Sequence, residues 1–258
     1  MRVLCYAQTN IGSGRDNNED NYYCNGTFKR DPAIPVAEAA AEQESKRLIY
    51  GVFDGMGGEA NGEQAALLCA QTLHRCSSDG PFDALDFFRR ANVAVCDMIA
   101  ASGQISGSTA ATVHLTGNHA YCCNVGDSRI YRLRGGRMEQ LTQDHSLVGE
   151  LVRAGILTAE EARTHPRRNI ITRALGTEGD NTPDLLAADL QPGDRFLLCT
   201  DGLTGMTRDD EIEKTLLDSQ TADEAADRLI QMALDAGGSD NVTLILCTGE
   251  EGKPWKQD

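Results

Sequence analysis

Four aspartates stand at the ends of apolar, strand-like runs and carry the strongest chemical signal in this sequence. Asp54 ends YGVFD, Asp127 ends CCNVGD, Asp201 ends FLLCTD, and Asp240 immediately precedes NVTLILC. A single such aspartate is usually a turn residue, because Asp bonds its own backbone and tolerates left-handed geometry. Four carboxylates at neighbouring strand ends would repel one another unless cations hold them. If these runs converge, we expect a site for divalent metal ions.

The donor atoms around these aspartates favour a hard divalent ion. Carboxylate oxygens, water and a backbone carbonyl, with no His or Cys at ligand spacing, suit Mg²⁺ or Mn²⁺ better than zinc. Gly55 directly follows Asp54 and lets the backbone approach an ion closely, so its carbonyl can be a ligand.

The same glycines also satisfy a nucleotide-binding pattern. Gly55, Gly57 and Ala60 match G-x-G-x-x-G/A between an expected strand and an expected helix. However, Asp54 would place negative charge beside a bound pyrophosphate. The helix after the glycines is also followed by a second helix, where a dinucleotide site needs a parallel strand. The sequence therefore disfavours a nucleotide-binding site at these glycines.

The elements that must position these residues are clustered strands and paired helices. Apolar runs predict strands near residues 2–8, 20–24, 48–53, 110–116, 120–125, 129–133, 194–199 and 242–247. Helical periodicity covers residues 61–77, 82–101, 146–154 and 221–236, and a Thr-x-x-Glu capping box opens a short helix within 158–168. Because strands and helices do not alternate, we predict an α+β fold with antiparallel sheets covered by helix pairs.

The chain length of 258 residues suits one large domain, which we place at residues 1–248. Residues 29–47 carry two prolines, many small residues and charged ends, which predicts an exposed insertion joining two strands and not a core element. Residues 249–258 read as a C-terminal tail.

Charge and hydropathy exclude several classes of partner. A net charge of -15 argues against nonspecific binding to nucleic acid or to anionic membranes. No apolar run approaches the roughly 18 residues of a membrane span, and the N-terminus lacks an apolar leader, so we expect a cytoplasmic protein. The nine cysteines form no C-x-x-C pair, and we expect small buried hydrophobic residues in a reducing compartment, not a disulfide framework or a zinc site.

A further group near the N-terminus, Arg15 with Glu19 and Asp20, would by itself suggest only a charged turn. It is followed in order by VFDGMGG (52–58), GSTA (107–110), VGDSR (125–129), LTQDHSLV (141–148), ITRALG (171–176), CTDGL (199–203) and SDN (239–241). This ordered set closely resembles the metal-dependent protein phosphatase family, type 2C, in its bacterial branch. The resemblance runs from about residue 2 to 248. It implies a β-sandwich of two antiparallel sheets flanked by helix pairs, with a dinuclear metal centre at one end.

The resemblance implies a ligand role for the four strand-end aspartates. Asp54 would bridge two Mn²⁺ or Mg²⁺ ions. The Gly55 carbonyl would bind one of them, and Asp201 and Asp240 the other. Asp127 would help to hold a third, weaker ion, with Asp201 shared.

The resemblance also implies how a phosphate ester would be hydrolysed. Glu19 and Asp20 would act mainly through bound waters, and Arg15 would bind the phosphate, a role that suits a guanidinium. Water activated by the two ions would then attack phosphoserine or phosphothreonine directly. Many eukaryotic members have His where this chain has Met56, which cannot donate a proton, so the source of the leaving-group proton stays open.

Residues 144–170 match the family's flap beside the active site. The cluster of Arg163, His165, Arg167 and Arg168 is basic in an acidic chain, and we hypothesise that it helps to select phosphosubstrates; a solvated basic face is an equal alternative. The expected partners are phosphorylated proteins, the targets of a Ser/Thr kinase, and we expect a monomer.

Two other functions stay open at this point. C-x₅-R, typical of cysteine-dependent phosphatases, occurs at Cys24, Cys69 and Cys123, although nine cysteines and many arginines make chance matches expected. A catalytically silent phosphoprotein-binding domain on the same fold is the second alternative.

Overall fold

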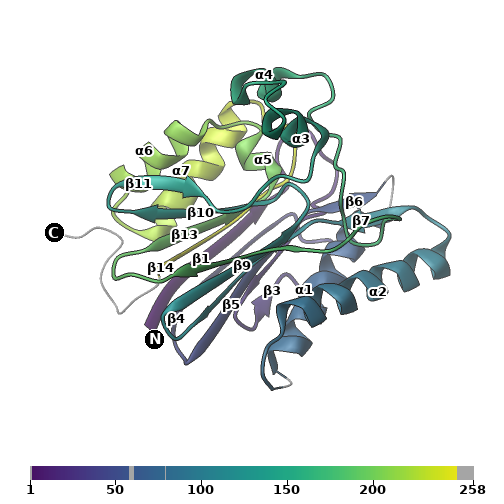
Figure 1. Ribbon diagram of the computed structural model, residues 1–258, viewed down its shortest axis with the longest axis horizontal. Helices are drawn as coiled ribbons and strands as arrows, with labels where there is room; N and C mark the ends of the chain where they lie inside the picture. Colours follow the sequence, from purple (N-terminus) through teal and green to yellow (C-terminus); the bar gives the residue numbers. More distant parts are fainter. Residues whose placement is uncertain (1, 58–60, 79, 249–258) are drawn as a thin grey trace.

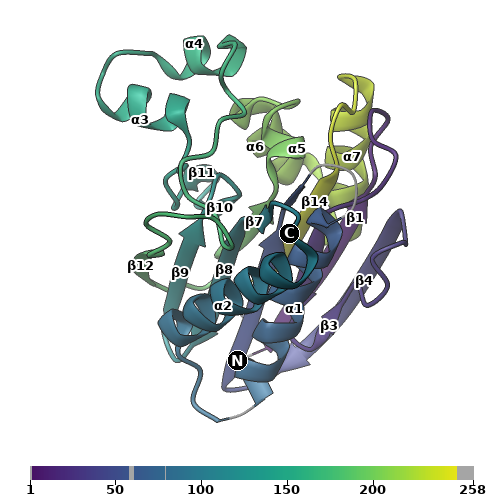
Figure 2. The ribbon, with the colours of Figure 1, turned by 90° about the vertical axis from the view of Figure 1, so that its right-hand side faces the viewer.

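Two six-stranded antiparallel sheets face each other, and helices cover the outer side of each (Figures 1 and 2). The computed structural model describes every residue except 1, 58–60, 79 and 249–258. The predicted tail and Ala60 of the glycine pattern lie outside the described residues.

Strand order places the first and last strands of the chain in the middle of one sheet. This first sheet runs β11 (Arg137–Gln140), β10 (Arg129–Arg134), β13 (Arg195–Cys199), β14 (Val242–Thr248), β1 (Arg2–Asn10) and β4 (Val36–Glu44). The second sheet runs β12 (Asp184–Asp189), β9 (His119–Val125), β8 (Ala110–Thr116), β5 (Arg47–Phe53), β2 (Asn21–Cys24) and β3 (Thr27–Phe28). A small ladder pairs β6 (Gly55–Gly57) with β7 (Ser106–Ser108).

The helices form one pair or group on each outer face and one excursion. Helices α1 (Gly62–Ser78) and α2 (Ala84–Ser102) pack on the second sheet, and α5 (Asp201–Thr204), α6 (Asp209–Asp218) and α7 (Ala222–Asp235) pack on the first. Helices α3 (Leu147–Arg153) and α4 (Ala159–Thr164) project beyond the sheets in Figure 2. The predicted capping box is present, since Thr158 and Glu161 exchange hydrogen bonds at the start of α4.

The central strand β5 shows why the sandwich has three apolar layers. Leu48, Tyr50 and Val52 lie in the core between the two sheets, whereas Ile49 and Phe53 lie in the core beneath α1 and α2. Successive side chains of a strand point to opposite faces, so a strand buried on both faces must be apolar throughout. Each of these side chains contributes roughly 1.5–3 kcal/mol by burial. The run therefore anchors its C-terminal end, where Asp54 follows, rigidly in the fold.

The α+β fold with two antiparallel sheets and helix pairs is confirmed. The prediction for residues 29–47 is wrong in part, because residues 36–44 form β4, which pairs with β1 along its whole length at the edge of the first sheet. The side chains of this strand described by the structure are half-buried or exposed. Its alanines and glutamates carry little β-propensity, so only the pairing with β1 makes it a strand.

One expectation about the cysteines is also wrong. Cys5 of β1 and Cys24 of β2 are paired in a disulfide between the two sheets. Sequence spacing could not show this pairing, because it depends on two strands of opposite sheets facing each other. The other seven cysteines are free, and all of them except Cys96 are buried, as expected. Among the described helices, none is long and apolar enough to cross a bilayer.

Candidate metal centre

The predicted aspartates meet at one end of the sandwich, where strands of both sheets end. Asp54 follows β5 and Asp127 follows β9 in the second sheet, whereas Asp201 follows β13 and Asp240 precedes β14 in the first. Burial raises the pKa of Asp54 far above its ordinary value, and four neighbouring charges raise it further: Asp20, Asp201, Asp127 and Asp240. Such repulsion requires short distances. Sheet packing therefore assembles the carboxylates that the sequence scatters.

Asp127 shows most directly that this cluster suits a cation. The residue is only 7 % exposed, and its Oδ1 atom is buried without a hydrogen-bond partner among the described residues. Burial raises the pKa of Asp127, and the charge of Asp201 raises it further. A buried carboxylate oxygen without a donor is costly, and a hard divalent ion is the partner that such oxygens prefer. The donor set thus fits Mg²⁺ or Mn²⁺.

The turn before β2 brings two further predicted acids to the cluster. Asp20 is almost fully buried, and the Thr200 hydroxyl donates to its Oδ2 atom at 2.8 Å. The backbone N–H of Glu19 donates to Asn241 Oδ1 at 2.8 Å, and the Asn241 amide donates to two backbone carbonyls of the N-terminal segment. Sequence reasoning missed Thr200 and Asn241. The sequence feature that could have identified them is a polar residue directly beside a strand-end aspartate: Thr200 precedes Asp201, and Asn241 follows Asp240.

The glycines after Asp54 are required by close backbone packing. Gly55 pairs with Ser108 in the small ladder, and a Cβ atom on Gly55 would overlap the carbonyl oxygen of Gly62. A Cβ atom on Gly62 would in turn meet the carboxylate carbon of Glu19 at 2.6 Å. The turn and the start of α1 therefore close directly around the acidic cluster. Because α1 leads into α2 and carboxylates surround Asp54, the nucleotide interpretation is excluded.

Arg15 lies at the rim of the cluster and engages one predicted ligand. Its Nη2 atom donates to Asp240 Oδ2 at 2.8 Å, and the side chain is 47 % exposed. The hydrogen bond with Asp240 raises the pKa of Arg15 above its ordinary value. Among the described residues, no three His, Cys, Asp or Glu side chains are already arranged to hold one ion together. The candidate ligands therefore lie near one another, but Asp240 is hydrogen-bonded to Arg15.

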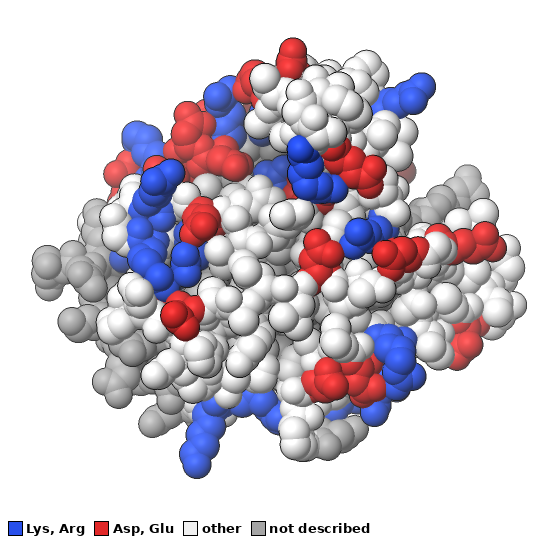
Figure 3. Space-filling model, in the orientation of Figure 1, with Lys and Arg blue, Asp and Glu red and all other residues white. Residues whose placement is uncertain are grey.

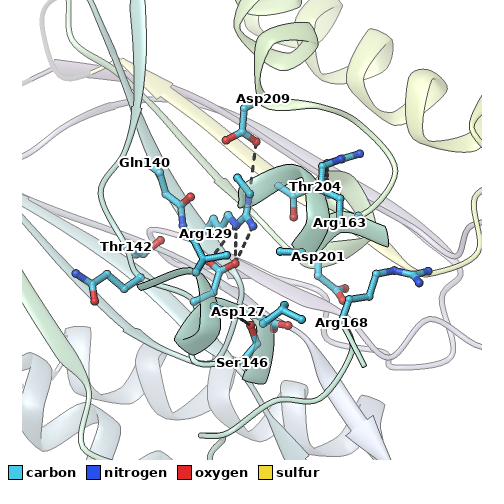
Figure 4. A pocket seen from close by; sticks show the side chains of 18 of the residues that line it. Asp127, Arg129, Gln140, Thr142, Ser146, Arg163, Arg168, Asp201, Thr204 and Asp209 are labelled. Carbon is cyan, nitrogen blue, oxygen red and sulfur yellow. Dashed lines mark hydrogen bonds and ion pairs between the residues drawn. The ribbon is translucent and has the colours of Figure 1, made fainter. Parts of the chain in front are cut away.

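A pocket of about 740 Å³ opens beside the acidic cluster (Figure 4). Asp127 and Asp201 lie in one wall. The helical excursion contributes Val148, Val152 and Arg168 to the lining, and residues in and next to α5 and α6 contribute further side chains. The pocket is therefore large enough for several side chains of a ligand that also reaches the carboxylates.

The structure separates the three predicted flap arginines. Arg163 donates from Nη1 to the backbone carbonyls of Thr204 at 2.9 Å and Thr207 at 3.3 Å, so it ties α4 to the end of α5. Arg168 lines the pocket, and its guanidinium makes no hydrogen bond or ion pair with the described residues. Arg167 is exposed and does not line the pocket. Of the three, Arg168 is the one free to meet a ligand in the pocket.

A second set of residues that the sequence did not single out holds the base of the flap. Arg129 pairs with Asp144 through Nε at 3.0 Å and Nη2 at 2.7 Å, and its Nη1 donates to the Tyr131 hydroxyl at 2.8 Å. His145 accepts a hydrogen bond at Nδ1 from the backbone N–H of Gly126, at 3.2 Å. These contacts connect the turn that carries Asp127 to the segment that enters α3. The motifs VGDSR and LTQDHSLV contain all of these residues except Tyr131, so motif membership was the only sequence signal for them.

The cysteine-dependent alternative fails on accessibility. Cys24 is bonded to Cys5, and burial raises the pKa of Cys69 and of Cys123 to about 12. A nucleophilic cysteine must be a thiolate that reaches its substrate. The sulfurs of Cys24, Cys69 and Cys123 are bonded or buried, so none of them can act as the nucleophile.

Comparison with known proteins agrees with this geometry. Residues 6–242 match the family model described as protein phosphatase 2C. The serine/threonine phosphatase stp of Listeria innocua is 34 % identical over 250 residues, which cover 93 % of each chain. The crystal structure of the Mycobacterium tuberculosis serine/threonine phosphatase PstP/Ppp aligns with a TM-score of 0.80 at 34 % identity, covering 95 % of this chain and 98 % of that one.

A further solved structure is informative about the site. The catalytic domain of PstP in complex with two manganese ions aligns with a TM-score of 0.79 at 33 % identity, over 96 % of this chain and 99 % of that chain. The family match, the aligned relative and the aligned structures all cover nearly the whole length of this chain. The chain therefore belongs to the protein phosphatase 2C family, and it is a protein phosphatase.

Proposed function

We propose that this chain removes phosphate from phosphoserine and phosphothreonine in proteins, using two Mn²⁺ or Mg²⁺ ions held by the strand-end aspartates. The observation that carries the proposal is the buried acidic cluster, with Asp127 Oδ1 unpartnered among the described residues. The manganese ions of the PstP relative support the choice of metal. The domain that performs the reaction spans residues 1–248.

The ligand set follows from the position of each donor. Asp54 follows β5 at the end of the sandwich where carboxylates from both sheets gather, and it would bridge the two ions, with the Gly55 carbonyl beside it. Asp201 and Asp240 would bind the ion on the side of the first sheet, and Asp127 a third ion. Bound in this way, the ions would supply an activated water and offset the charge of the phosphate.

The residues around the ions would bind the phosphate and exclude competing chemistry. Arg15 is half-exposed at the rim, so its guanidinium can leave Asp240 and grip two phosphate oxygens. Glu19 and Asp20, which the turn before β2 brings to the cluster, would act through waters. Met56 lies on β6 opposite Gly107, and its thioether cannot protonate a leaving group.

The substrate contact outside the phosphate is proposed for the flap, residues 144–170, and for Arg168 in particular. The face shown in Figure 3 carries acidic and basic side chains interspersed, without one dominant sign. Selection of a substrate therefore needs local charge, which Arg168 offers at the pocket wall. Arg163 holds the flap against α5, and Arg167 would meet a substrate only outside the pocket.

The cellular setting remains part of the proposal. We propose that the substrates are targets of a Ser/Thr kinase, that the protein acts in the cytoplasm, and that it acts as a monomer. The net charge of -15 supports an absence of nucleic-acid and membrane partners. A silent binding domain is disfavoured, because every matched acidic position is present.

The test is turnover of p-nitrophenyl phosphate and of a phosphothreonine peptide, with Mn²⁺ and with EDTA. We expect stimulation by Mn²⁺, and a loss of at least about 100-fold in Asp201→Asn. Asp97→Asn, a matched change on an exposed position of α2, should keep full activity. Turnover that is indifferent to Mn²⁺, or an Asp201→Asn variant with full activity, would overturn the proposal.

A further inference from the structure

Lys29 is a buried charge that the proposed reaction does not use. The residue lies directly after β3 and is only 3 % exposed. Its ammonium group makes one hydrogen bond among the described residues, from Nζ to the backbone carbonyl of Asn18 at 2.7 Å. Burying an ammonium group is expensive unless specific partners repay it. A lysine in this place therefore calls for a reason.

The contacts of Lys29 all converge on the turn that carries Glu19 and Asp20. Its Nζ holds the carbonyl at the start of that turn, on Asn18. Its backbone holds the other end, because the Lys29 N–H donates to Asn21 Oδ1 at 3.1 Å and Asn21 Nδ2 donates to the Lys29 carbonyl at 2.9 Å. Lys29 thus clamps both ends of a four-residue turn whose two middle residues are predicted to face the ions.

Asn18 completes the brace from the opposite side. Its Oδ1 atom accepts from the backbone N–H of Asp20 at 3.1 Å, which fixes the direction of that acid. Its Nδ2 atom donates to Thr9 Oγ1 at 2.9 Å and to the Pro35 carbonyl at 2.8 Å. The brace therefore uses both ends of the segment 29–35, which leads from β3 to the edge strand β4 (Figure 2).

The charges around Lys29 point the same way. Burial lowers the pKa of Lys29 to about 8, and the negative charge that acts on it most strongly in the opposite direction is that of Asp20, followed by Glu63 and Asp31. The ammonium group therefore lies close to Asp20, and its burial keeps solvent from screening the attraction between the two charges. Lys29 cannot touch a substrate, because its side chain does not reach the surface.

We propose that Lys29 is a positioning residue of the metal centre, which holds the turn of Glu19 and Asp20 in the geometry that binding of the two ions requires. The proposal rests on the proposed function for the identity of the ions. It also gives residues 29–35 a role, which is to brace the turn that carries Glu19 and Asp20. Residues that orient metal ligands typically change metal affinity by about 10–100-fold when they are lost.

The test compares Lys29→Met, which keeps length and removes both the charge and the donor, with Lys46→Met, an exposed position of the same region. Mn²⁺ binding is measured by calorimetry on the metal-free proteins, and thermal unfolding with and without Mn²⁺. We expect the dissociation constant of Mn²⁺ to rise about tenfold or more in Lys29→Met and to stay unchanged in Lys46→Met. The KM for p-nitrophenyl phosphate at saturating Mn²⁺ should stay within about twofold, because Lys29 does not meet the substrate.

A purely structural role would give a different pattern. Lys29→Met would then lower the melting temperature equally with and without Mn²⁺ and leave Mn²⁺ affinity unchanged, and this result overturns the proposal. If Lys29→Met does not fold, Lys29→Leu carries the same comparison, since it also lacks both the charge and the N–H donor that holds the Asn18 carbonyl. Wild-type Mn²⁺ affinity in that variant also overturns the proposal. Calorimetry needs no turnover, so a wild-type protein that binds Mn²⁺ without hydrolysing phosphate esters would refute the proposed function and leave this test intact.

Discussion

Neutralising Asp54 should change stability in opposite directions with and without metal. Burial and four neighbouring aspartates raise the pKa of Asp54 far above its ordinary value. A carboxyl group with a raised folded-state pKa contributes stability below pH ~4, and this contribution is lost as pH rises through the folded-state pKa. At pH 7.5 the group is therefore a cost in the metal-free protein. Asp54→Asn removes that cost and keeps the backbone hydrogen bonds with Thr109.

The magnitude follows from the burial of the group. Replacing one charge of a largely buried cluster should stabilise the metal-free protein by about 2 kcal/mol. For a chain of this size, each kcal/mol shifts the melting temperature by about 2–4 °C, so Asp54→Asn in EDTA should melt about 4–8 °C above the wild type. Mn²⁺ at 100 times its dissociation constant adds about 2.7 kcal/mol to a protein that binds it. We expect the wild type to gain this increment, and the variant, which lacks the carboxylate proposed to bridge the ions, not to gain it.

The assay is thermal unfolding of both proteins in EDTA and in excess Mn²⁺ at pH 7.5. We expect the variant to be the more stable protein in EDTA and to lose that advantage in Mn²⁺. Asp97→Asn, which makes the same charge change on the exposed face of α2, should move neither melting temperature by more than about 1 °C. The reasoning is refuted if Asp54→Asn is destabilised in EDTA, or if Mn²⁺ stabilises it as much as the wild type.

Two further predictions concern the pocket and the response to acid. Arg168→Ala should raise the KM for a phosphothreonine peptide with acidic flanking residues about fivefold and leave the KM for p-nitrophenyl phosphate unchanged. The control variant Arg167→Ala should alter neither KM. Equal effects of Arg168→Ala on both substrates would show that Arg168 does not contact the peptide. Burial lowers the pKa of His114 to about 4, so the folded protein favours the neutral ring. Its contribution to stability is present above pH ~6.5 and is lost as pH falls towards 4. Between pH 6.5 and 4.5 the wild type should therefore lose about 1 kcal/mol more free energy of unfolding than His114→Gln does, as measured by urea unfolding. The variant His119→Gln, at an exposed position, should lose as much as the wild type.

Regular elements were predictable where one strong local pattern decides them. The run at residues 48–53 and the periodic stretch at 61–77 correspond to β5 and α1, since burial on both faces or on one stripe leaves a clear trace in the sequence. Strand β4 was missed, because its alanines and glutamates become a strand only through the hydrogen bonds of β1. The short ladder of β6 and β7 was missed for a similar reason: three residues are too few to show a period.

The site divides in the same way. Aspartates at strand ends are visible in the sequence, and their order along the chain suffices to identify the family. The partners that orient them are not visible, because an amide or an ammonium group such as Asn241 or Lys29 acquires its role only through a neighbour that is distant in the chain. The three flap arginines illustrate the point. Their residue type is the same, but the Arg163 guanidinium donates to the carbonyl of Thr204 at the end of α5 and to that of Thr207 just beyond it, whereas the Arg168 guanidinium makes no such bond with the described residues.

By itself the sequence indicated the chemistry of this protein: hard oxygen ligands for divalent ions, a candidate phosphate-binding arginine, and a net charge of -15 that argues against nonspecific binding to nucleic acid. Residue type and chain order suffice for these conclusions, because each donor atom is a property of one side chain. Only the tertiary structure decided which carboxylates share a site, which cysteines pair, and which flap arginine lines the pocket without a hydrogen bond to the described residues. Those properties depend on distance and burial, which the packing of two sheets sets between residues such as Asp20 and Asp201 that lie far apart in the chain.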